Sequence, residues 1–298
     1  MRLTQAYVQY LKERNDAAAI AQMATALSDS AHSTEADLLR QLHTKGAGWT
    51  VMQGGPFAGG RVYLGEGLPA DARAGELWFD PCELGVMLLV PRPIDPDEDQ
   101  LTETMRKRLT PYLGWLALRP VARWQMAAFL RLAKLQPQRQ QLTAPYAYLD
   151  GTRLTPAPET ALLTSISPTE ALLYCNWLGK HCASQYLLAE AYAMLGAAEF
   201  QRLWGNSRRE WVGFAGWEPT LAIAVSPATL HQDPRDEADA DAVPEESLRM
   251  LYDEWATPPD VSFRTEVPSS LGLIREQGSG SSLTMEPSRL SAPLARFA

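Results

Sequence analysis

The chain has 298 residues, of which 46% are hydrophobic and 21% charged, and its formal net charge is −8. A chain of this length and composition can bury one large core or two modest ones, and it is not typical of a disordered protein. No stretch approaches the roughly 18 consecutive apolar residues of a membrane-spanning helix, and the N-terminus lacks the apolar core of a secretory signal. We therefore expect a cytoplasmic globular protein that does not associate with membranes.

The negative charge is concentrated between residues 231 and 260. Ten acidic residues and two arginines lie in this segment, so its balance of −8 equals that of the whole chain. Because contacts to phosphates need a positive surface, this charge excludes nonspecific nucleic acid binding. The simplest interpretation of the segment is a solvated loop, and the alternative is a docking surface for a basic partner. The basic cluster at residues 106–108 is typical of a solvated helix face.

The cysteine and histidine content limits metal and redox chemistry. The three cysteines, Cys82, Cys175 and Cys182, are too few and too widely spaced for a disulfide framework or a four-cysteine zinc site. Cys175 falls on the apolar face of a predicted helix, which predicts a buried thiol. No histidine is followed by a second one helical turn later, so we expect surface histidines, no metal site and no cofactor; the four are His32, His43, His181 and His231.

Residues 2–45 predict three helices separated by polar breaks. The second helix follows Asn15-Asp16, and the third begins near Ser33, where Thr34 and Asp37 have the spacing of a capping box. Lys45-Gly46 marks the end of the third helix. We assign residues 1–45 to a small helical N-terminal extension. Two roles stay open for it: packing against the main domain, or binding a partner as an appendage.

Helical periodicity gives way to strands from residue 46. Residues 46–64 have the pattern strand, glycine turn, strand, and residues 76–81 and 86–90 predict two further strands, the second of them buried on both faces. Gly55 and Gly60 have the spacing of a phosphate-binding Walker loop. Arg61 and Val62 stand where that loop needs a lysine and a hydroxyl, and no helix follows, so we do not expect nucleotide binding here.

Beyond these strands, three further helices are predicted, near residues 118–130, 167–178 and 184–195. The sequence marks both ends of the middle helix, because Ser167 and Glu170 have the spacing of a capping box and Gly179 supplies a left-handed residue past the last turn. Residues 221–225 and 261–267 predict strands. From residue 268 onward, Ser, Gly and Pro make up 13 of 31 residues, so we expect a flexible tail.

A series of segments resembles, in order, the motifs of the formylglycine-generating enzyme family, also called the sulfatase-modifying-factor domain. The most specific match is residues 166–180, which resemble the family segment Val-Ser-Trp-x-x-Ala-x-x-Tyr-Cys-x-Trp-Leu-Gly-Lys. The other matches are Gly54-Gly55-Pro56-Phe57 with Gly60, residues 119–129 around Pro120-Val121, Gly205-Asn206 with Glu210-Trp211, and Ser262-Phe263-Arg264.

The resemblance covers about residues 46–267 and implies an α+β fold. This fold is the family's variant of the C-type lectin fold, with twisted antiparallel strands, two main helices and much irregular loop. We therefore divide the chain into a helical N-terminal extension (1–45), a formylglycine-generating-enzyme-like domain (46–267) and a flexible tail (268–298).

The reactive groups of the family are missing at the matching positions. The resemblance implies a copper-thiolate oxidase mechanism, which needs two cysteines shortly before the final strand. This chain has no cysteine after Cys182. The sulfoxide-synthase branch of the family holds iron through histidines one helical turn apart, and that spacing is also missing. Residues 182–189 lack the acidic residues of the corresponding family segment. The chain therefore resembles a degenerate member that retains the scaffold.

Three hypotheses about function follow from this resemblance. The first is a catalytically inactive recognition module that binds a protein partner through the N-terminal helices, the loops or the C-terminal tail, as a subunit of a bacterial defence or signalling assembly. The alternative is a metal-dependent oxidase of the same family with an unconventional site. The third is a structural subunit of a larger complex that has no separate ligand.

The candidate binding residues are tryptophans and arginines in the region after the central helices. Lectin-like scaffolds hold variable loops on a rigid frame, and recognition in such frames lies on loops and exposed aromatic residues. For each tryptophan, a position in the core is the alternative. The candidates are Trp204, Arg208, Arg209, Trp211, Trp217 and Trp255. No catalytic residue is assigned.

Overall fold

The computed structural model describes residues 3–30, 32–55, 57–93, 112–132, 160, 162–163, 168–196, 198–200, 209–213, 222–225 and 261–268. Several expectations lie outside these residues. They concern Ser167, Trp204, Arg208, Trp217, Trp255, His231, the basic cluster at 106–108, the acidic segment at 231–260 and the tail beyond residue 268.

Three helices form the N-terminal region, as the sequence predicts. They are α1 (Leu3–Lys12), α2 (Ala17–Asp29) and α3 (Ser33–Lys45). Asp16 caps α2, because its side chain accepts a hydrogen bond from the Ala19 amide at 2.8 Å. The capping box expected at Thr34 and Asp37 is wrong. The helix already begins at Ser33, so Thr34 has helical backbone geometry and cannot act as the cap.

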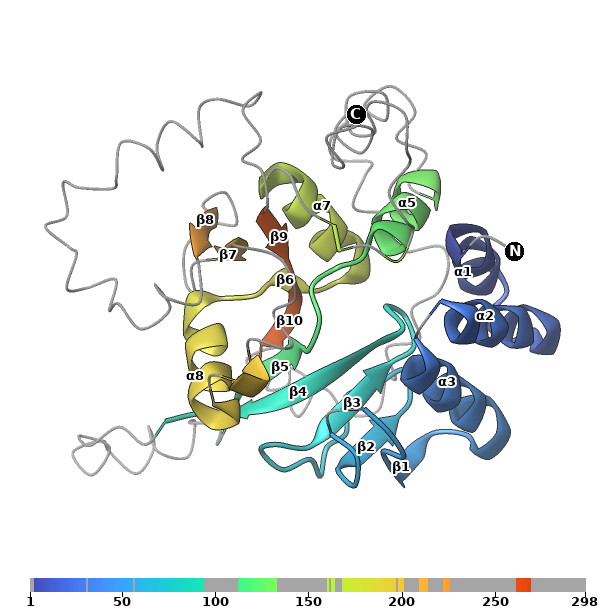
Figure 1. Ribbon diagram of the computed structural model, residues 1–298, viewed down its shortest axis with the longest axis horizontal. Helices are drawn as coiled ribbons and strands as arrows, with labels where there is room; N and C mark the ends of the chain where they lie inside the picture. The colour runs from blue at the N-terminus through green and yellow to red at the C-terminus, as the bar shows by residue number, and fades with distance from the viewer. Residues whose placement is uncertain are drawn as a thin grey trace, which may run out of the picture.

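A seven-stranded mixed sheet forms the centre of the molecule (Figure 1). Its strands, in spatial order, are β1 (Gly48–Val51), β2 (Arg61–Leu64), β3 (Leu77–Asp80), β4 (Gly85–Pro91), β5 (Tyr112–Ala117), β10 (Thr265–Pro268) and β6 (His181–Cys182). Neighbouring strands are antiparallel except β2 and β3, which are parallel. The strands predicted at 46–64, 76–81 and 86–90 are confirmed, whereas β5 and β6 were not predicted.

A smaller sheet has the order β8 (Ala222–Val225), β7 (Arg209–Gly213), β9 (Val261–Phe263). β7 pairs with β8 antiparallel and with β9 parallel. Each sheet thus contains one parallel pair besides the antiparallel pairs that the resemblance implies, so both sheets are mixed. The single strand expected at 261–267 is divided at Arg264, where the chain passes from the small sheet into the large one.

Three further helices follow the predicted order: α5 (Arg123–Leu132), α7 (Pro168–Leu178) and α8 (Gln185–Leu195). Gly179 has a φ of +69°, which confirms the left-handed residue expected after α7. Ser184 caps α8 through the Leu187 amide at 3.3 Å, and its own amide donates to Glu266 at 2.8 Å. Burial raises the pKa of Glu266 and the two hydrogen bonds from Ser184 oppose that shift.

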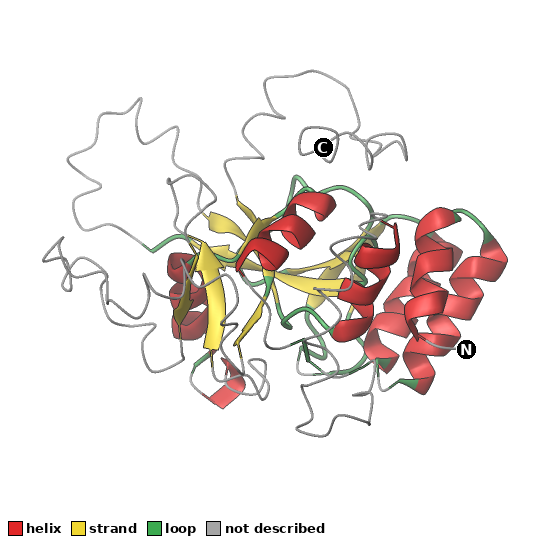
Figure 2. Ribbon diagram, turned by 90° about the horizontal axis from the view of Figure 1, so that it is seen from above, coloured by secondary structure: helices red, strands yellow, loops and turns green. Residues whose placement is uncertain are grey.

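The N-terminal helices and the large sheet share one hydrophobic core. This core joins side chains of α1, α2 and α3 to those of β2 to β5 and continues to α8. Figures 1 and 2 show the three N-terminal helices gathered at one side of the strands, next to α5. The ring of Tyr7 on α1 packs edge-on against Trp124 on α5, with centroids 4.8 Å apart. Of the two roles left open for residues 1–45, the structure therefore shows packing against the main domain.

Two further clusters complete the core. One joins α5, α7, β7 and β9 and contains Tyr174, Trp211 and Phe263. The other contains Trp78, Met87 and Trp115, and it lies on the face of the large sheet opposite to the core shared with the N-terminal helices. Both faces of β4 are therefore buried, as its continuous apolar run predicts. None of the helices in the described ranges combines the length and apolar character needed to cross a bilayer.

Candidate functional site

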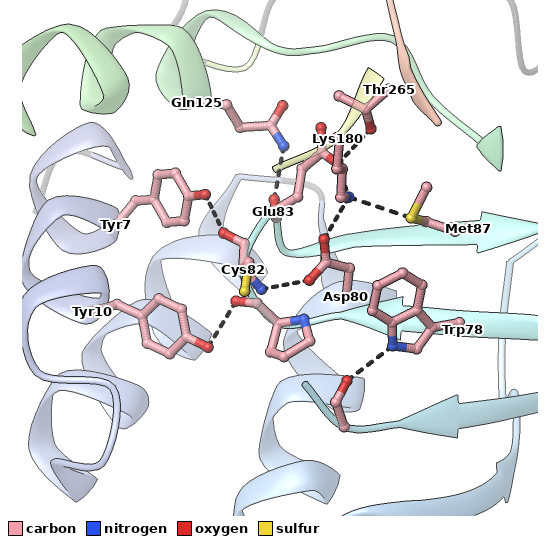
Figure 3. A network of polar contacts seen from close by, with 12 residues as sticks. Tyr7, Tyr10, Trp78, Asp80, Cys82, Glu83, Met87, Gln125, Lys180 and Thr265 are labelled. Atoms are coloured by element: carbon pink, nitrogen blue, oxygen red, sulfur yellow. Dashed lines mark hydrogen bonds and ion pairs between the residues drawn. The ribbon is translucent and has the colours of Figure 1, made fainter. Parts of the chain in front are cut away.

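A buried lysine is the centre of the polar network shown in Figure 3. The Nζ atom of Lys180 lies 2.5 Å from Asp80 Oδ2 and 2.6 Å from Glu83 Oε2, and it lies 3.3 Å from the sulfur of Met87. All three charged residues are at least 96% buried. Thr265 on β10 donates a further hydrogen bond to Glu83 Oε2 at 2.7 Å. The network therefore joins β3, the turn before β4, the end of α7 and β10.

Local sequence explains how these groups meet. Asp80 ends β3, and its Oδ1 accepts from the Cys82 amide at 2.8 Å, which fixes the turn that carries Glu83. Lys180 follows the left-handed Gly179, so the chain reverses at the end of α7 and directs the lysine inward. Burial alone would lower the pKa of Lys180, but Asp80 and Glu83 raise it by more, so the lysine stays protonated.

The same turn is held by side chains from the helices. Tyr7 donates to the carbonyl of Cys82, and Tyr10 donates to that of Pro81 at 2.9 Å. Gln125 on α5 donates to the Glu83 carbonyl at 2.8 Å. Since a buried ion pair needs its remaining hydrogen bonds satisfied, these contacts complete the network. It is closed to solvent and serves to fix the frame.

A second buried ion pair joins the two sheets. The Nε atom of Arg264 lies 2.7 Å from Glu210 Oε2 and its Nη2 lies 2.5 Å from Glu210 Oε1. Its Nη1 donates to the carbonyls of Ala117 and Leu118 at the end of β5. This bidentate geometry explains why the chain changes sheet at Arg264, because the guanidinium bonds to β7 and to β5 at once.

An open pocket lies above this frame, between the first turn of α3 and the segment that leads from β5 into α5. Its cavity volume is about 70 Å³. The floor is the turn at residues 83–86, and Met52 and Phe57 form an apolar wall. Gln125, which also bonds to Glu83, connects the pocket to the polar network below. A partly open apolar cavity with a few convergent polar groups is the usual form of a binding site.

Besides Thr34, Glu83 and Gln125, the pocket is lined by four residues with polar side-chain groups: His32, Glu35, Arg119 and Trp124. Arg119 stands at the mouth with 52% of its side chain exposed, and its Nη1 lies 3.5 Å from Glu35 Oε1. His32 Nδ1 lies 3.9 Å from Glu35 Oε2 and 3.5 Å from Arg119 Nη1. Burial lowers the pKa of His32, Glu35 raises it and Arg119 lowers it, with a net shift downward, so the imidazole is neutral near pH 7.

Of the candidate residues taken from the sequence, the structure describes only Arg209 and Trp211, and neither lines this pocket. Trp211 is 2% exposed and packs in the core cluster with Tyr174 and Phe263, so the core alternative holds for it. Arg209 is the first residue of β7. The structure brings neither of them to the pocket.

The cysteines and the described histidines differ in their exposure to solvent. Cys82, Cys175 and Cys182 are all buried and unpaired, as expected for Cys175. Burial is the main cause that raises the pKa of Cys82 to about 12, and burial followed by a hydrogen bond with Cys182 raises that of Cys175. His43 and His181 are exposed as expected, but the expectation is wrong for His32, which is half-buried because it lines the pocket. Within the described ranges, no group of three His, Cys, Asp or Glu side chains is placed to hold a metal ion.

No protein-family model, curated protein or solved structure matches this chain.

The residues of the pocket were missed because they lie far apart in the sequence. In the sequence, Trp124 only falls within the motif at residues 119–129, and Glu35 only falls in the first turn of a predicted helix. A signal did exist for the network beneath. Asp80 follows the apolar residues of β3 and Lys180 follows a helix-ending glycine, and charges between apolar elements indicate a buried ion pair.

Proposed function

We propose that this chain is a recognition module without catalytic chemistry, built on a degenerate formylglycine-generating-enzyme-like frame, and that the pocket between α3 and α5 binds a protein partner. One observation carries the proposal. The pocket is open, two residues that line it carry buried polar atoms with no hydrogen-bond partner among the described residues, and the buried lysine and arginine of the frame next to it are paired with carboxylates. Such a contrast supports a rigid scaffold with one surface left to be completed by another molecule.

The state of the thiols supports a non-catalytic role. The chemistry of the family requires thiolates, because the thiolate is the metal ligand and the nucleophile. Here burial raises the pKa of Cys82 to about 12 and raises that of Cys175. Both are therefore protonated at neutral pH, and all three cysteines are buried.

The size of the pocket supports a protein partner over a free cofactor. Its volume of about 70 Å³ is well below the range of about 300–1,000 Å³ for sites that enclose cofactors or drug-sized ligands. A single inserted side chain suits it better, and such anchor residues contribute much of the affinity of protein interfaces. The partner that we propose is another protein of the same cytoplasmic assembly.

Capture of the partner by matched arginine variants tests this function. Arg119→Ala removes the cation at the mouth of the pocket, and Arg61→Ala removes an exposed arginine of β2 that pairs with Glu76. We expect Arg119→Ala to reduce capture of the wild-type partner from native lysate by about tenfold or more, and Arg61→Ala to leave it unchanged.

Two results would contradict the proposal. One is equal capture by wild type and Arg119→Ala, with both folded by circular dichroism. The other is stoichiometric copper or iron in the purified chain together with oxygen-dependent oxidation of a cysteine peptide, which would favour the oxidase alternative.

A further inference from the structure

Two residues that line the pocket each carry a buried polar atom without a hydrogen-bond partner among the described residues. These atoms are Oε2 of Glu35, a residue that is 7% exposed, and Nε1 of Trp124, which is 2% exposed. The first accepts hydrogen bonds and the second only donates. Leaving such groups unpaired in the folded state is unfavourable, and native proteins pair most of them. The pocket therefore lacks one donor and one acceptor.

The charges of the pocket define the charge of the missing group. Glu35 is already balanced by Arg119, whose Nη1 lies 3.5 Å from Glu35 Oε1, and His32 is neutral near pH 7. A cationic ligand would add a second positive charge beside Arg119. An anionic ligand would place a like charge against Glu35. A neutral group avoids both costs, because no uncompensated charge is buried.

We propose that the pocket recognises a primary carboxamide, the head group of a glutamine or asparagine side chain on the partner. Its NH₂ group would donate to Glu35 Oε2 and its carbonyl oxygen would accept from Trp124 Nε1. Met52 and Phe57 line the same pocket and provide apolar surface for the methylene groups of the inserted side chain. This inference rests on the proposed function, because it names the chemistry of the partner residue that enters the site.

The indole N–H resonances of the full-length chain test this assignment by NMR. Acetamide is the probe, and acetate and acetamidinium are controls of nearly the same shape that lack the donor or the acceptor. Two other tryptophans serve as internal references, because Trp49 Nε1 already bonds to Asp71 at 3.0 Å and Trp78 Nε1 to the Gly65 carbonyl at 2.9 Å. We expect acetamide at millimolar concentration to shift the Trp124 resonance saturably and leave the two references in place, with acetate and acetamidinium at least tenfold weaker.

Variants confirm the site. Glu35→Ala is expected to weaken acetamide binding by about tenfold or more, while unchanged Trp49 and Trp78 resonances show that the variant is folded. Trp124→Phe, which keeps an aromatic ring without the N–H group, is expected to weaken binding similarly, measured by the competition of acetamide with the captured partner. Full binding by both folded variants would overturn the assignment.

The outcomes separate this inference from the proposed function. No saturable shift with acetamide would mean that the pocket holds only water, and equal shifts with acetate or acetamidinium would remove the carboxamide preference. Either result overturns the inference, even where partner capture still depends on Arg119. Acetamide binding that does not displace the captured partner overturns the assignment to a partner side chain. Displacement by acetamide but not by acetate supports both proposals.

Discussion

Buried polar residues of two kinds occur in the described part of this protein. Lys180 with its two carboxylates and Arg264 with Glu210 form closed ion pairs. Glu35 and Trp124, in contrast, each carry a buried atom without a hydrogen-bond partner among the described residues, and both residues line one pocket. Because an unsatisfied buried group costs about 1–3 kcal/mol, the first kind serves the fold and the second indicates a ligand.

Replacement of Lys180 tests the role of the closed network. Lys180→Met leaves Asp80 and Glu83 buried without a cation, so we expect the free energy of unfolding to fall by about 3–5 kcal/mol. Arg61→Met breaks an exposed pair with Glu76 and is expected to cost about 1 kcal/mol or less. Urea unfolding at pH 7 measures both. A loss below about 1 kcal/mol for Lys180→Met would show that the network does not hold the frame.

His32 predicts a pH dependence of stability. Its pKa is lowered in the folded state, chiefly by burial and also by Arg119, against an opposing effect of Glu35, and Trp124 packs edge-on against its ring. The unfolded chain then binds the proton more readily, so stability is lost as the pH falls below the ordinary histidine value near 6.5.

We expect wild type to lose more stability than His32→Gln between pH 7 and pH 5, measured by urea unfolding at both values. A parallel decline of the two proteins would mean that His32 titrates as a free histidine.

The sequence carries much less information on these residues than on the elements that hold them. Lys180 was recognised only as a motif residue, and its carboxylate partners come from a different part of the chain. Glu35 and Trp124 line the same pocket only because α5 packs against the N-terminal helices. Periodicity describes single elements, so it cannot place two side chains from distant elements in one pocket.

At the level of elements, local signals predicted the boundaries well. Asp16, Gly179 and Ser184 mark helix ends that the structure confirms. The exceptions depend on contacts between distant residues. β5 was missed because Gly114 interrupts its apolar pattern, and the division between β9 and β10 follows from the contacts of Arg264 with Glu210 and the end of β5.

The close approach of β10 explains why β5 has a glycine at position 114. A Cβ atom at this position would lie 2.6 Å from the carbonyl oxygen of Val267 on β10, whereas one at Gly85 would meet only Glu83 Cγ at 3.9 Å. We expect Gly114→Ala to reduce the free energy of unfolding by about 1–3 kcal/mol, because the two strands must separate. Gly85→Ala is expected to change it by no more than about 0.5 kcal/mol. Equal effects in urea unfolding would show that β5 and β10 do not approach so closely.

At the level of the whole molecule, all three thiols are shielded from solvent. Cys82, Cys175 and Cys182 are buried, and burial raises the pKa of the first two. We expect the native chain to react with a thiol-specific disulfide reagent only as fast as it unfolds, and the chain in urea to release three equivalents at once. Rapid reaction of any cysteine in the native state would reopen the case for thiol chemistry.

We propose that this protein binds its partner at the pocket between α3 and α5. Cross-linking from a diazirine amino acid placed at position 119 tests it most directly, with the same amino acid at Val51 and Tyr186 as controls, since these side chains are 45% and 49% exposed on other elements. We expect one discrete protein adduct from position 119 in native lysate and no adduct of that mass from the two controls. No adduct from position 119, or the same adducts from all three positions, would contradict it.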